Sequence, residues 1–103
     1  MMKMKGPMGN MMKQAQKLQA KMLKLQDELA DQTVEATAGG GMVKVTANGR
    51  QQIVSITIEK EVVDPQDVDM LQDLVLTAVN GGLEASRKLQ SERLGPLAGG
   101  LPF

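Results

Sequence analysis

The chain has 103 residues, no cysteine or histidine, a formal net charge of zero and a single aromatic residue, Phe103. This composition excludes disulfides, thiolate nucleophiles, imidazole bases and the usual zinc ligands, and its length predicts one small domain with a limited core. No run of about 18 apolar residues indicates a membrane span. We therefore expect a cytoplasmic protein that is not an enzyme and needs no metal, cofactor or small-molecule substrate.

Charge is segregated along the chain rather than absent. Residues 1–26 carry six lysines and no carboxylate, and residues 27–84 carry eleven carboxylates against three cations. Residues 85–103 carry three cations against Glu92. A basic arm on an acidic body favours a polyanion as the partner.

The first expected element is a long amphipathic helix. Residues 1–9 form an expected flexible basic lead-in, and Asn10 is a suitable N-cap. Apolar residues then recur in a heptad pattern up to about Asp31: Met11, Ala15, Leu18, Met22, Leu25 and Leu29. This spacing predicts a helix with an apolar seam that can dock another helix.

Alternation with period two predicts three strands after this helix, over residues 33–38, 42–47 and about 52–59. Gly39-Gly40-Gly41 separates the first two strands and is expected to form a turn. Asn48-Gly49 separates the second pair and is a strong hairpin signal, because both residues tolerate positive φ. The pattern predicts an antiparallel meander and the α+β class.

Asp64-Pro65 predicts the start of a second long helix, with the aspartate as cap and the proline in the first helical position. We expect this helix to run to about Leu94 and to end at Gly95-Pro96. Asn80-Gly81-Gly82 interrupts the pattern, which leaves open a kink, a break into two helices or a point of close packing.

The second helix is apolar around much of its circumference. The apolar residues between Leu74 and Val79 cover about 200°, more than packing against one sheet face requires. A helix fully buried within the monomer is the alternative, but a chain of this length offers little to bury it with. We therefore expect a homodimer.

Four lysines lie within an arc of about 80° beside the heptad seam: Lys13, Lys17, Lys21 and Lys24. The first three have no acid three or four residues away, whereas Lys24 has Asp27 and Glu28 nearby. Such a face is often only a solvated surface, and the spacing leaves that interpretation open. The acid-free run to residue 26 favours a phosphate-binding face.

The chemistry of these residues indicates which nucleic acid would bind. Lysines contact backbone phosphates as point charges and read bases poorly. Single strands and common RNA modules are bound through stacked aromatic rings, which this composition cannot supply. Duplex DNA held by its backbone fits better. Arg87, Lys88 and Arg93 form no stripe and are weaker candidates.

Three motifs occur in a specific order: GNMMKQAQK at 9–17, GGMVKVTANG at 40–49 and LQDLV at 71–75. Together they resemble the YbaB/EbfC family of bacterial nucleoid-associated proteins, and the likeness extends to the Gly-rich end at Leu101-Pro102-Phe103. The resemblance implies an α-β-β-β-α protomer with a dimerising DNA-binding domain, which we place at 10–94. The glycines and prolines after this domain predict a disordered tail at 95–103.

The resemblance also implies an intertwined homodimer whose long helices project like tweezers onto double-stranded DNA in the nucleoid. It implies a role in nucleoid organisation and gene regulation. By position, the four lysines match the basic helical face of the family, and Arg87, Lys88 and Arg93 match its second DNA-contacting helix.

Two other classes of function remain open on the residues alone. The heptad helix could dock a partner protein, so that the chain is an adaptor and DNA binding is incidental. A basic amphipathic helix could also lie on an anionic membrane. The apolar face lacks Trp and Phe, which argues against the membrane, and we expect no membrane partner.

Overall fold

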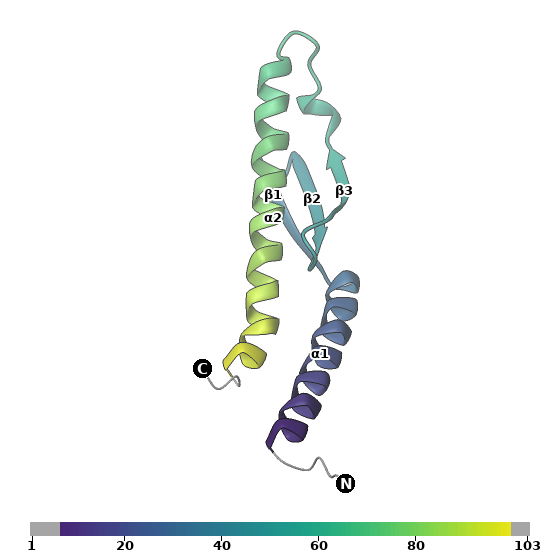
Figure 1. The fold of residues 1–103 in the computed structure, drawn as a ribbon. Helices are drawn as coiled ribbons and strands as arrows, with labels where there is room; N and C mark the ends of the chain where they lie inside the picture. The colour runs from purple at the N-terminus through teal and green to yellow at the C-terminus, as the bar shows by residue number, and fades with distance from the viewer. Residues whose placement is uncertain (1–6, 100–103) are drawn as a thin grey trace.

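The computed structural model describes residues 7–99 (Figure 1). Along the chain, one long helix precedes a three-stranded sheet and a second long helix follows it. The elements are α1 (Pro7–Asp31), β1 (Thr33–Ala38), β2 (Val43–Asn48), β3 (Ile53–Ile58), the 3-10 turn η1 (Lys60–Val62) and α2 (Val68–Gly99). The molecule is elongated, with extents of 78 × 21 × 16 Å. The predicted α-β-β-β-α order and α+β class are confirmed.

The sheet is the predicted antiparallel meander, in the order β1-β2-β3. β1 pairs with β2 from Thr33↔Asn48 to Ala38↔Val43, and β3 pairs with β2 with a register shift between Thr46 and Ala47. The turn between β1 and β2 contains Gly39, Gly40 and Gly41, whose φ angles are 64°, 68° and 94°. Only glycine adopts this left-handed backbone without strain, which explains the triplet.

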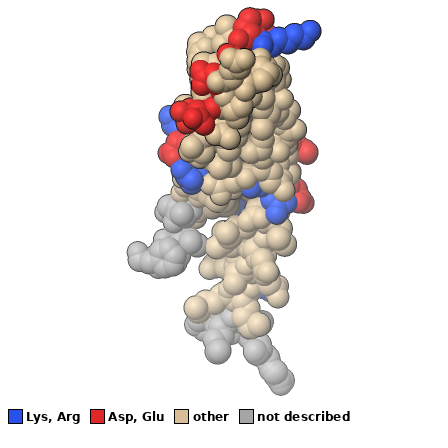
Figure 2. All heavy atoms as spheres, turned by 90° about the horizontal axis from the view of Figure 1, so that it is seen from above, with Lys and Arg blue, Asp and Glu red and all other residues tan. Residues whose placement is uncertain are grey.

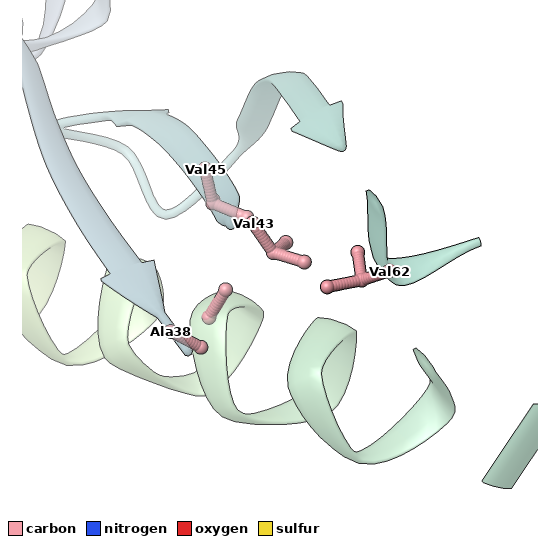
Figure 3. Close-up of a cluster of buried hydrophobic side chains, with 5 residues drawn as sticks. Ala38, Val43, Val45 and Val62 are labelled. Atoms are coloured by element: carbon pink, nitrogen blue, oxygen red, sulfur yellow. The ribbon is translucent and has the colours of Figure 1, made fainter. Parts of the chain in front are cut away.

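The core lies between the sheet and α2 and is small. It consists of Ala38, Val43, Val45, Val62 and Ala78, with larger apolar residues partly buried around it. Figure 3 shows Val43 of β2 and Val62 of η1 pointing toward one another beside α2. Because β2 is the middle strand and α2 covers one face of it, every second β2 side chain is buried.

α2 is one continuous helix that runs straight through this region in Figure 1, so Asn80-Gly81-Gly82 marks neither a break nor a kink. Of the three predicted alternatives, close packing is the correct one. A Cβ added at Gly82 would lie 2.9 Å from Val45 Cγ1, and one added at Gly81 would lie 3.1 Å from Ala36 Cβ. The missing side chains let α2 approach the sheet.

Three of the predicted helix ends need correction. α1 begins at Pro7, so Asn10 lies inside the helix, and the predicted flexible lead-in is wrong for residues 7–9. A proline tolerates the first turn because its missing N–H would have no partner there. Residues 1–6 of that predicted segment lie outside the described residues.

α2 begins at Val68 rather than at Pro65, and its cap is Asp67. The Asp67 carboxylate accepts the Met70 N–H at 3.3 Å, whereas Asp64 accepts the Gln66 N–H at 2.9 Å and forms a turn. Both aspartates can cap a helix, and the chain uses the second.

The C-terminal boundary also differs from the prediction. α2 continues through Gly95 and Pro96 to Gly99, so the predicted tail is helical over residues 95–99, and residues 100–103 lie outside the described part. The residue before a proline normally avoids the helical conformation because its Cβ meets the proline ring. Gly95 has no Cβ, which removes that clash.

The protomer leaves much apolar surface uncovered. α2 lies over β1 and β2, so Ile56 and Ile58 of β3 remain 45% and 38% exposed. An apolar groove of about 420 Å³ also runs along α2, and it is lined by Leu71, Gln72, Val75, Leu76 and Val79. On α1, only Leu25 and Leu29 of the predicted seam are buried, while Met11 is 65% exposed.

Candidate nucleic-acid interface

The hairpin turn between β2 and β3 fixes the direction in which α1 leaves the sheet. The Gly49 N–H donates to the carbonyls of Leu29 and Gln32 at 2.9 and 3.0 Å, at the C-terminal end of α1. Leu29 is 1% exposed. The last turn of α1 is therefore held against the sheet, and the rest of the helix projects away from it (Figure 1).

α2 also makes hydrogen bonds to this turn, through Ser86. The Ser86 hydroxyl accepts the Gln51 N–H at 2.8 Å and donates to the Asn48 carbonyl at 2.7 Å. The Asn48 side chain accepts the N–H groups of Arg50 and Gln52 at 2.9 and 3.1 Å. These residues link both helices to one hairpin, and no part of this network was predicted.

The four predicted lysines lie on the projecting part of α1, and all are exposed: Lys13, Lys17, Lys21 and Lys24. Within residues 7–99, the ion pairs are Arg87–Glu84 and Arg93–Glu28, so none of the four lysines pairs with a described carboxylate. Like charges three or four residues apart destabilise a helix slightly. Such a face is available to an external anion.

α1 and the end of α2 face each other across a groove of about 320 Å³. Its α1 side carries Lys21, Lys24, Leu25 and Glu28, and its α2 side carries Arg93, Pro96 and Leu97. The spacings i, i+3, i+4 and i+7 place each set on one helix face. The lining of the groove thus combines three apolar residues with three cations and one carboxylate.

The three predicted cations of α2 do not lie together. Arg93 lines this groove and donates to Glu28 at 3.3 Å. Arg87 and Lys88 are exposed, and at 100° per residue they are about 120° and 140° away from Arg93 around the helix. Arg87 pairs with Glu84 one turn earlier. The structure groups Arg93 with the α1 lysines and separates the other two.

Glu28 has a different partner from the one its position in the sequence indicates. It is four residues after Lys24, which predicts a local pair, but its carboxylate lies against Arg93, 65 residues away along the chain. No signal in a single sequence could identify this contact, because it depends on how α2 packs beside α1.

Acidic side chains gather at the opposite end of the molecule. Residues 59–73, which include η1 and the start of α2, hold six carboxylates and only one cation, Lys60. Figure 2 looks onto this end and shows carboxylates along its edges, with Lys and Arg side chains among them. The charge segregation of the sequence thus becomes a separation along the long axis, which would orient the molecule toward a polyanion with α1 first.

Within residues 7–99, no cluster of three or more carboxylates could hold a metal ion. In the same part of the chain, neither helix is both long and apolar enough to cross a membrane. The carboxylates at the start of α2 have another use, since Asp67 caps the helix and Asp69 lies in its first turn, where the dipole favours negative charge.

Comparisons with known proteins identify relatives of this chain. The chain is 56% identical over 98 residues to a nucleoid-associated protein of Pelotomaculum thermopropionicum, covering 95% of this chain and 93% of the relative. It is 57% identical over 98 residues to a nucleoid-associated protein of Desulforamulus reducens, with the same coverage. The match to both relatives spans nearly the whole chain.

A crystal structure of an uncharacterized Helicobacter pylori protein has the same fold, with a TM-score of 0.76 over 94% of this chain and 99% of that one. Its 20% identity shows the fold alone. The model of the YbaB/EbfC DNA-binding family matches residues 4–101. This match confirms the resemblance seen in the three motifs, and the chain belongs to the YbaB/EbfC DNA-binding family.

Proposed function

We propose that the chain is a non-enzymatic nucleoid-associated protein that binds duplex DNA mainly through backbone phosphates. The observation that carries the proposal is the row of exposed lysines on the projecting part of α1, none paired with a described carboxylate. Lys13, Lys17 and Lys21 are the principal contacts, and Lys24 adds to them at the groove. The protein acts in the cytoplasm on the nucleoid, where it shapes DNA and so influences gene expression.

The same chemistry favours duplex DNA over other nucleic acids. The single aromatic residue of the chain is its last one, so no platform for stacking unpaired bases can be built on the helices. Exposed lysines on a straight helix contact phosphates without reading bases. Binding is therefore expected to depend strongly on salt and weakly on sequence.

The working unit is proposed to be a homodimer. The groove along α2 and the exposed isoleucines of β3 leave apolar surface in water, in a protomer whose core contains no fully buried side chain larger than leucine. A second copy would remove this surface from water. The exposed seam of α1 also supports the adaptor alternative, in which a partner helix docks against Met11 and Met22.

A charge-reversal experiment tests the DNA-binding proposal. We expect Lys17→Glu with Lys21→Glu to weaken binding of a random-sequence duplex by at least about tenfold in a gel-shift titration, because two phosphate contacts become repulsive. The dimer should survive in a sizing measurement.

Lys44→Glu with Lys60→Glu is the matched control, since both lysines are exposed and neither lies on α1. It changes the net charge equally and should alter affinity much less. An equal loss of duplex affinity in the two variants would show that net charge alone, and not the α1 lysines, determines binding. Unchanged binding by the α1 variant would favour the adaptor, which a stoichiometric partner surviving nuclease treatment would identify.

A further inference from the structure

Glu28 is the exception on an otherwise basic helix face. At 100° per residue it lies within the arc of the four lysines, close to the direction of Lys21. Its carboxylate meets the Arg93 guanidinium of α2 at 3.3 Å, at the groove that Lys21 and Lys24 also line. Three cations thus line the groove, and Arg93 is the one that pairs with its carboxylate.

We propose that Glu28 stands in for a DNA phosphate: in the free protein it occupies Arg93, and in the complex a backbone phosphate displaces it. The inference rests on the proposed function and adds an autoinhibitory contact to it. A duplex strand that follows the lysines along α1 toward the sheet reaches the groove between Lys24 and Arg93. Its phosphate would meet the position that Glu28 now holds.

The ion pair is placed where this exchange costs little. The side chains of Arg93 and Glu28 are 35% and 43% exposed, so a phosphate can reach the guanidinium and the carboxylate can turn into solvent without backbone movement. Partly exposed ion pairs contribute little to stability. Arg93 and Glu28 share a single hydrogen bond, and a guanidinium binds phosphate at least as well as carboxylate, so a phosphate can replace this bond.

Phosphate and Glu28 cannot both remain beside Arg93, because two like charges would be brought together in a half-buried groove. Glu28 therefore lowers the affinity for DNA in proportion to the strength of its pair with Arg93. It also holds Arg93 in place at the groove before DNA arrives.

The two halves of the ion pair should respond with opposite signs. Glu28→Gln should tighten duplex binding, by about fivefold more than Asp27→Asn, whereas Arg93→Gln should weaken it. Asp27 is the matched control because it is the neighbouring exposed acid on α1, and at 100° per residue it points away from the groove. In an Arg93→Gln background, Glu28→Gln should change affinity no more than Asp27→Asn does.

A purely structural ion pair predicts a different result, since both substitutions break the same contact and would then change affinity in the same direction. That outcome, or equal effects of Glu28→Gln and Asp27→Asn, would overturn the inference while leaving the proposed function intact. Failure of the unmodified protein to bind duplex would instead overturn the proposed function. Circular dichroism of each variant, compared with the unmodified protein, separates loss of fold from loss of binding.

Discussion

Ser86 shows how one small side chain joins the two helices. It is fully buried, and its hydroxyl both accepts the Gln51 N–H and donates to the Asn48 carbonyl. Gln51 has a positive φ of 61°, which a residue other than glycine adopts only when its surroundings hold it. The Ser86 hydroxyl therefore helps to hold the β2–β3 turn, and this turn fixes the end of α1.

Ser86→Ala should lower the free energy of unfolding by about 1–3 kcal/mol. It removes both hydrogen bonds of a buried hydroxyl, and it leaves the Gln51 N–H and the Asn48 carbonyl only their longer bond to each other, at 3.3 Å. Urea unfolding followed by circular dichroism measures this change. Ser91→Ala is the control, since Ser91 is exposed on the same helix and should change stability by less than about 0.5 kcal/mol. Equal losses at the two positions would show that the hydroxyl of Ser86 does not support the turn.

The hairpin was predictable at this scale, but the conformation of its turn was not. Asn48-Gly49 correctly predicts the reversal, yet Gln51 rather than either of these residues takes the left-handed conformation. Gly49 is needed for a different reason: a Cβ there would lie 2.9 Å from the Leu29 carbonyl oxygen. The turn propensity of the dipeptide is local, whereas this contact depends on the position of α1.

At the scale of elements, the packing of α2 against the sheet depends on Gly82. The residue is buried, and Val45, which faces it, is 0% exposed and has a stiff β-branched side chain. A glycine inside a helix costs about 1 kcal/mol relative to alanine. The close approach of α2 to β2 offsets this cost.

We expect Gly82→Ala to destabilise the protein despite its better helix propensity. The new methyl would lie 2.9 Å from Val45 Cγ1, and overpacking of this kind costs about 1–3 kcal/mol. Thermal unfolding measures the net effect. In a Val45→Ala background the same substitution should become neutral or stabilising, because the clashing methyl is gone. An equal loss in both backgrounds would contradict the packing explanation.

Periodic elements were predictable here, and their ends were not. The heptad spacing of α1 and the alternation of β2 correctly predict helix and strand, since each follows from many residues. The helix ends depend on single residues. Asp64 and Asp67 are both good caps, and Pro96, which usually ends a helix, lies inside α2.

The candidate site divides in the same way. The exposed lysine face follows from helical spacing and was predicted in full, although its role in binding DNA stays a prediction. The pairing of Glu28 with Arg93, and the separation of Arg93 from Arg87 and Lys88, depend on tertiary packing. A single sequence carries no signal for them.

At the scale of the whole molecule, the uncovered apolar surface needs an occupant. Leu76 is 59% exposed and lines the groove of α2, whereas its neighbour Thr77 is exposed outside that groove. We expect Leu76→Arg to dissociate the proposed dimer into monomers, because it would bury an unpaired charge in the interface. Analytical ultracentrifugation at micromolar concentration measures this change.

Thr77→Arg introduces the same side chain one residue later and should leave the dimer intact. A dimer that persists in Leu76→Arg would place the interface elsewhere, with the exposed seam of α1 as the next surface to test. A loss of association in both variants would point to added charge rather than to the groove.

The slope of duplex affinity against salt concentration reports how many phosphates are neutralised, and so how many α1 helices contact one duplex. Each neutralised phosphate contributes about 0.9 to the log–log slope of affinity against salt. Lys17→Gln with Lys21→Gln should therefore reduce the slope by about 3.6 if both helices of a dimer bind, and by about 1.8 if only one does. Fluorescence anisotropy across a salt series measures the slope, and Lys44→Gln with Lys60→Gln should leave it unchanged.

In the Leu76→Arg monomer the α1 substitutions should reduce the slope by only about 1.8, since a single helix remains. A reduction near 1.8 in both the dimer and the protomer would show that the second helix does not touch the duplex.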